Sequence, residues 1–93
     1  MENKVIYEFK DLALASFLIL KGNQFKGVKL RYAKHFQEYK VYIQIEGIKE
    51  ELMQLQKDYT ENKYELVKDR LLNEVIYNLR REVEYKLVGD NCE

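Results

Sequence analysis

The sequence has few of the side chains that perform catalysis or hold metal ions. Its 93 residues include one serine, one threonine, one cysteine and one histidine. A catalytic triad needs a nucleophile within hydrogen-bond reach of a base, but Ser16 lies in the most apolar run of the chain and Cys92 is the penultimate residue. One cysteine and one histidine cannot supply the four ligands of a structural zinc site. We therefore expect a protein that is not an enzyme and that uses no cofactor or metal.

The small numbers of glycine and cysteine residues, the zero net charge and the short apolar stretches exclude further classes of protein. The four glycines are too dispersed for a phosphate-binding loop, and the lone cysteine excludes a disulfide framework and fits a reducing compartment. Basic and acidic residues number 16 each, and this zero net charge argues against a general polyanion binder. The longest apolar stretch, residues 12–20, is less than half of a membrane span. The sequence predicts a cytoplasmic, globular protein with no membrane contact.

The first part of the chain changes from a strand pattern to a helix pattern. Residues 5–9 alternate in polarity, which predicts a strand. Asp11 is a suitable N-cap for an apolar helix over residues 12–20, and Gly22 follows as its C-terminal glycine. Because this helix is apolar on every side, it must be buried on more than one side.

Two further alternating segments, residues 25–32 and 39–46, predict an antiparallel pair of strands with one apolar face. The segment between them carries no signal for a tight two-residue turn. The sequence thus predicts an α+β fold in the order βαββα, with a small three-stranded sheet that contains antiparallel strands and is packed by the short buried helix. The predicted single domain, residues 1–93, consists of a strand–helix–hairpin unit at 5–47, a helical segment at 48–88 and a frayed tail at 89–93.

The C-terminal half has a helical pattern that no proline or glycine interrupts between Ile48 and Leu87. Its apolar residues form two seams that point in different directions, one before and one after Tyr59. Two structures are compatible with this change in the direction of the apolar seam. Either the helix breaks near Asp58–Asn62 and its second piece folds back onto the domain, or one helix about 60 Å long faces another copy of the protein with its second half.

Whether the segment forms one helix or two stays open. We favour self-association through it, because an exposed apolar stripe usually marks an interface. The sequence therefore predicts a homodimer formed through the C-terminal helix. Tyrosines at the edges of the seam fit this interpretation, because tyrosine suits half-buried and interface positions. The candidate self-association or partner face consists of Leu71, Val75, Tyr77, Leu79, Val83, Tyr85 and Leu87.

The polar face of the two alternating strands combines basic and aromatic side chains. Open sheets bind single-stranded nucleic acid with rings that stack on bases and cations that hold phosphates. The candidate nucleic-acid face consists of Lys29, Arg31, Lys40, Tyr42 and Gln44. The alternative is that these are ordinary solvated strand positions, where lysine discourages edge-to-edge aggregation.

Residues 5–47 resemble a small domain family of unknown function found in bacteria and their phages. The resemblance lies in the helix start Phe9-Lys10-Asp11-Leu12, the helix end Leu20-Lys21-Gly22 and the strand opening Phe25-Lys26-Gly27-Val28, followed by the alternating strand 41–46. It covers about half of the chain and brings no catalytic residue. It implies an accessory protein of a phage or mobile element without known catalysis.

These observations lead to two hypotheses about function. The first is a non-enzymatic binding protein that acts by contact with an unknown host protein, as an inhibitor or regulator of a host factor such as a defence factor. The second is a nucleic-acid-binding protein that uses the basic and aromatic face of the strand pair.

Overall fold

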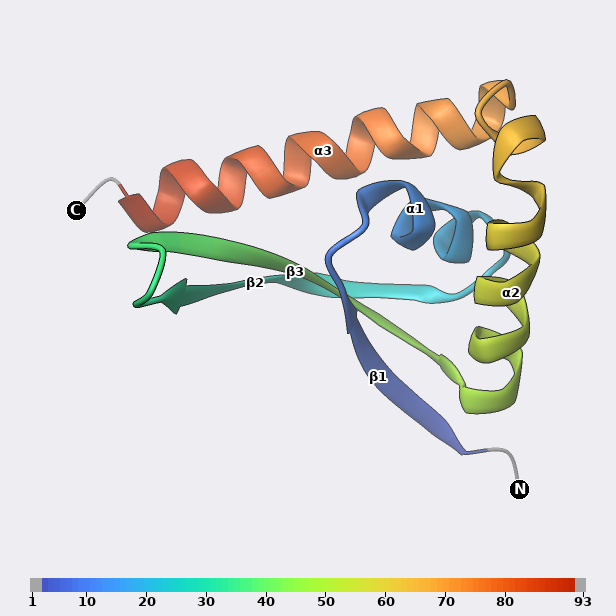
Figure 1. Cartoon of the computed structure of the whole chain (residues 1–93), viewed down its shortest axis with the longest axis horizontal. Coiled ribbons are helices and arrows are strands. Elements are labelled where there is room, and N and C mark those ends of the chain that lie inside the picture. Colours follow the sequence, from blue (N-terminus) through green and yellow to red (C-terminus); the bar gives the residue numbers. More distant parts are fainter. Residues whose placement is uncertain (1–2, 92–93) are drawn as a thin grey trace.

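The fold has two layers, a three-stranded antiparallel sheet and three helices. The computed structural model describes residues 3–91. Its elements in chain order are β1 (Lys4–Phe9), α1 (Leu12–Leu20), β2 (Gln24–Ala33), β3 (Glu38–Ile48), α2 (Lys49–Leu66) and α3 (Arg70–Asn91). Figure 1 shows α1 and α3 above the sheet and α2 across its end. The predicted α+β class is confirmed, and the C-terminal helical segment is divided into two helices.

The central strand of the sheet is β3, because the strand order is β1-β3-β2. Phe9 of β1 and Val28 of β2 both pair with Ile43 of β3, from opposite sides. The predicted alternation holds: Ile43 and Ile45 are buried, whereas the residues between and beside them on β3 are half-buried. The apolar face packs against the helices, and the described residues place no helix over the polar face (Figure 1).

Caps at both ends hold α1 in place. The Asp11 carboxylate accepts hydrogen bonds from two backbone N–H groups of the first turn, at 3.0 and 3.2 Å. At the other end Gly22 adopts a φ of +101°, and the N–H groups of Gly22 and Asn23 donate to carbonyls of the last helical turn. These two bonds form a Schellman motif, in which glycine is favoured because of its positive φ. The predicted N-cap and C-terminal glycine are confirmed.

The centre of the core is α1, whose residues 15–18 are all buried. Leu18 belongs to a cluster with the buried residues of the sheet and of the neighbouring helices. On the far side of the helix, the Phe17 ring lies 5.6 Å from the Tyr59 ring of α2. The Ser16 hydroxyl donates to the carbonyl four residues earlier at 2.8 Å, so this serine is a satisfied core residue.

The C-terminal segment folds back over α1. The α2 helix contains one non-helical residue, Asn62, and continues to Leu66. The chain then reverses over residues 67–69, and the Asp69 carboxylate caps α3 by accepting a backbone N–H from its first turn at 3.0 Å. Of the two structures that the sequence left open, the broken helix that folds back is observed, and the reversal lies later in the chain than the predicted Asp58–Asn62.

The change of phase between the two seams is a consequence of this reversal. Leu52 and Tyr59 of α2, and Leu72 and Leu79 of α3, are all buried within the one chain. Of the predicted frayed tail, the backbone of residues 89–91 continues α3, and residues 92–93 lie outside the described residues.

Candidate interaction surfaces

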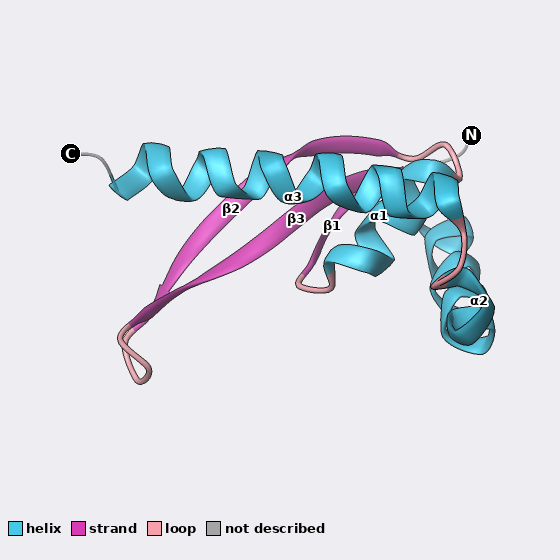
Figure 2. Ribbon diagram, turned by 90° about the horizontal axis from the view of Figure 1, so that it is seen from above, coloured by secondary structure: helices cyan, strands magenta, loops and turns pink. Residues whose placement is uncertain are grey.

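The outer part of the β2–β3 hairpin extends beyond the rest of the sheet. The last residue of β1 pairs with Ile43, so residues 29–42 form a two-stranded ribbon, here called the arm. Figure 2 shows that the arm also diverges from the C-terminal half of α3. The arm contains four basic residues and one acidic residue, in a chain whose net charge is zero. Positive charge is therefore concentrated on the part of the sheet that the helices do not cover.

The five residues of the candidate nucleic-acid face do share one face of the sheet, the face opposite the helices. On this face, Lys29 pairs with Tyr42 and Arg31 pairs with Lys40 across the hairpin. The Arg31 guanidinium lies over the Tyr42 ring, 4.9 Å from its centre. The grouping by alternation is thus correct as a placement of side chains, and binding of nucleic acid stays a prediction.

A residue that the sequence analysis did not include, Glu8, changes the charge of this face. Its carboxylate forms an ion pair with Arg31 and accepts a hydrogen bond from the Gln44 amide at 3.2 Å. The strand order brings β1 beside β3, and this places Glu8 next to Gln44. Alternation alone placed Glu8 on a polar face, but no local pattern showed which strand would lie beside it.

The same contacts shift the titration of Glu8. Burial of the carboxyl opposes its ionisation, but hydrogen bonds from Gln44 and Arg31, together with the positive charges of Arg31 and Lys29, outweigh burial and lower the pKa of Glu8 below its ordinary value of 4.5. Glu8 is therefore ionised at neutral pH and neutralises Arg31, which leaves fewer free cations for phosphates.

The tip of the arm exposes three aromatic side chains. Tyr32, Phe36 and Tyr39 are 53%, 68% and 53% exposed. The Tyr32 and Tyr39 rings lie 5.3 Å apart across the hairpin, and the Lys40 ammonium lies 4.9 Å from the centre of the Phe36 ring. Tyr32 and Tyr39 point to the apolar face of the sheet, but the arm diverges from α3 here (Figure 2), and both side chains are exposed.

The residues of the candidate self-association face differ in how far the structure exposes them. Leu79 is 3% exposed and belongs to the core of the chain itself, so it is not available to a partner. Val75, Val83 and Leu87 are half-buried. Leu71, Tyr77 and Tyr85 are exposed, and the Tyr85 hydroxyl is 3.5 Å from the Arg81 guanidinium that donates to it. Homodimer formation itself stays a prediction.

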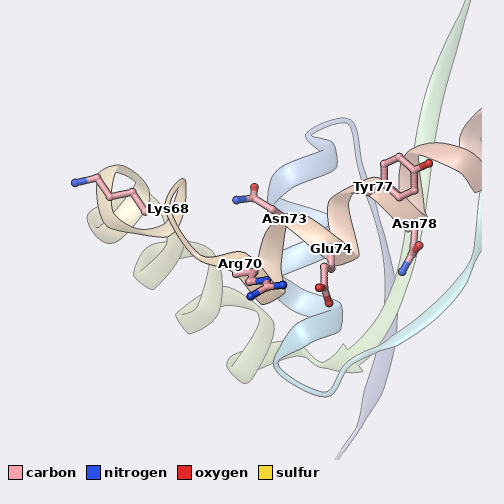
Figure 3. A pocket seen from close by; sticks show the side chains of 6 residues that line it. All are labelled: Lys68, Arg70, Asn73, Glu74, Tyr77 and Asn78. Carbon is pink, nitrogen blue, oxygen red and sulfur yellow. The ribbon is translucent and has the colours of Figure 1, made fainter.

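Two hollows on the described residues border α3, one open and polar and one apolar. One of about 560 Å³ runs along the start of α3 and is lined by Lys68, Arg70, Asn73, Glu74, Tyr77 and Asn78. Figure 3 shows these side chains fanning out from the helix and the preceding turn, and all six are exposed. An apolar cavity of about 260 Å³ lies between the three helices. Among residues 3–91 there is no group of three or more His, Cys, Asp or Glu side chains that could hold a metal ion.

Comparisons with known proteins do not assign the chain to a family. No family model, no curated protein and no solved structure matches the chain. The resemblance of residues 5–47 to a bacterial and phage domain family stays a prediction. None of the helices in the described part of the chain is long and apolar enough to cross a membrane.

Proposed function

We propose that this chain is a non-enzymatic binding protein that acts by contact with another protein, as an inhibitor or regulator of a host factor, and that the arm is its contact surface. The observation that carries the proposal is the exposure of Tyr32, Phe36 and Tyr39 on a ribbon that lies outside the core. Aromatic side chains are enriched in the buried centres of protein interfaces. An isolated two-stranded ribbon is at best marginally stable in water, so a partner that covers it would stabilise it.

The charge of the arm defines the chemistry of the partner. The arm carries four basic residues and a single acidic one, Glu38, and the ammonium of one basic residue, Lys40, lies over the Phe36 ring. A complementary surface would have an apolar depression for Phe36 and an acidic rim. Complementary charge at the rim mainly accelerates association and selects the partner, whereas the desolvated rings supply most of the affinity.

The test is affinity capture from the lysate of the native host with three forms of the protein. Phe36→Ser/Tyr39→Ser removes two exposed rings of the arm, and Met53→Ser/Tyr64→Ser removes two large exposed side chains of α2 as a matched control. The wild type and the control should capture the same host protein. The arm variant should bind that purified protein at least tenfold more weakly, since hot-spot aromatics contribute about 2 kcal/mol or more each. Equal capture by all three forms, or capture by none, would contradict the proposal.

A second candidate function is binding of single-stranded nucleic acid by the same arm. It is favoured by Lys29 and Lys40 on the open face, with Tyr42 directly opposite Lys29, and it is opposed by the neutralisation of Arg31 by Glu8. The test is fluorescence anisotropy with a labelled oligonucleotide between 20 and 300 mM salt. Binding that weakens steeply with salt and is lost in Lys29→Ala/Lys40→Ala would support it. No binding at the lowest salt would exclude it.

A further inference from the structure

The two edges of the sheet differ in how they are protected. Edge strands present unpaired backbone groups that can pair with another chain, and natural sheets protect them with bulges and exposed lysines. The β2 edge has both devices. Its register shifts between Phe25 and Gly27, Gly27 has a φ of +137°, and Lys26 and Lys29 are exposed.

The β1 edge has no bulge. Its six residues pair with β3 in one continuous register, Lys4 with Ile48 through Phe9 with Ile43. In the described part of the chain, β1 pairs with no strand on its other side. Ile6, at the middle of the strand, is 51% exposed on the open face of the sheet. Lys4 is exposed at the start of β1, but the centre of this edge carries neither a lysine nor a bulge. An exposed apolar side chain at the centre of such an edge is typical of a strand that pairs with another chain.

We infer that β1 pairs antiparallel with β1 of a second copy of this chain, about a two-fold axis at Ile6. The proposal is independent of the function assigned to the arm. It would join two three-stranded sheets into one continuous sheet of six strands. The interface is isologous, as in most homodimers, because the same residues contribute from each copy.

The sequence of β1 is complementary to itself in this register. On the open face Ile6 lies opposite Ile6 of the second copy, and Lys4 lies opposite Glu8 on both sides of the axis. On the covered face Val5 lies opposite Tyr7. Opposite charges and β-branched–aromatic pairs directly across an antiparallel ladder are stabilising. Glu8 already bonds Arg31 and Gln44, but a carboxylate has about four acceptor positions, so it can also accept from a lysine.

Neighbouring registers are less favourable. A shift by one residue would place the open face of one sheet beside the covered face of the other. A shift by two residues in one direction sets Lys4 opposite Lys10 and Ile6 opposite Glu8, and in the other direction it sets Ile6 opposite Lys4. The register centred on Ile6 is the one that pairs both charges and apolar side chains.

The test is sedimentation equilibrium of the full chain from 1 to 200 µM. The wild type should reach a mass near twice 11.3 kDa. Lys4→Glu, which opposes Glu8 of the second copy, should raise the dimer dissociation constant at least tenfold. Ile6→Lys should leave a monomer at all concentrations. Lys26→Glu makes the same charge reversal on the β2 edge and should change the constant less than twofold.

Hydrogen exchange locates the interface independently of the variants. Amides of β1 should become more protected as the protein concentration rises, while those of β2 and α3 should not change. A monomeric wild type at 200 µM would overturn the proposal. A dimer that persists in Ile6→Lys, or that gains protection in α3 and not in β1, would also overturn it. Circular dichroism of each variant verifies that any loss of dimer is not a loss of fold.

Discussion

The two ends of the β2–β3 hairpin share the same alternation of apolar and polar residues but have different surroundings. At the root, Ile43 and Ile45 are buried beneath the helices. At the tip, Tyr32 and Tyr39 occupy equivalent positions on the same face and are exposed. Alternation therefore determines which way a side chain points, whereas the position of the covering helices determines whether it is buried. Because the arm diverges from α3 (Figure 2), its aromatic side chains are free to contact a partner.

The prediction with the largest expected effect compares the stability costs of substituting two residues of β3. Ile45→Ala removes a fully buried side chain from the cluster that contains Leu18 and Leu52, and it should lower the free energy of unfolding by about 3 kcal/mol. Val41→Ala, four residues nearer the tip and half-buried, should cost about 1 kcal/mol or less. Urea denaturation of both variants measures the difference. Equal costs would show that the arm is part of the core.

A second test examines how tightly the root is packed. A Cβ atom at Gly47 would collide with the Asn23 amide oxygen and would lie 3.1 Å from a Leu52 methyl group. Gly47→Ala should therefore cost about 2 kcal/mol, as overpacking does. The cost should fall in an Asn23→Ala background, because the nearest colliding atom is absent there. A double-mutant cycle by urea denaturation measures this coupling, and strict additivity would contradict the packing explanation.

The smallest expected effect concerns the contact that joins the arm to β1. The lowered pKa of Glu8 means that the folded state binds this proton less tightly than the unfolded state. The stabilisation is therefore present above the ordinary value of 4.5 and is lost as the pH falls through the lowered folded value. Acid should loosen the arm before the core, which hydrogen exchange of the Arg31 and Lys40 amides can follow.

Glu8→Gln is the control for this titration, because its side chain has no charge to lose. The difference in arm protection between wild type and Glu8→Gln should shrink as the pH is lowered from 6 to 3. A difference that does not change with pH would show that the Glu8–Arg31 pair does not hold the arm.

The parts of the fold that the sequence predicted are those set by neighbouring residues. The Asp11 cap, the C-terminal Gly22 and the two faces of each strand depend on spacings of a few residues, and the structure confirms them. The turn between α2 and α3 was expected as one of two alternatives but was placed too early, because it contains no glycine or proline that marks its position. Its one readable signal was Asp69, a good N-cap residue just before the apolar pair Leu71-Leu72.

The candidate site depended on information that local patterns do not carry. Lys29, Arg31 and Tyr42 were correctly placed together, since they belong to one hairpin. The ion pair between Arg31 and Glu8 joins residues 23 positions apart, and it required the order of strands in the sheet. Leu79 was included in the predicted self-association face for a similar reason. Its burial depends on where α3 folds back, and no local pattern of the sequence shows this.

The pairing of β1 with β3 has a consequence for synthesis on the ribosome. The first strand is made early, but its partner ends at Ile48, about 40 residues later. At typical elongation rates of about 5–20 residues per second, both edges of β1 remain without a partner for several seconds. Unpaired strand edges are prone to pair with another chain, so capture of β1 by a second chain during this interval is expected to compete with correct closure of the sheet.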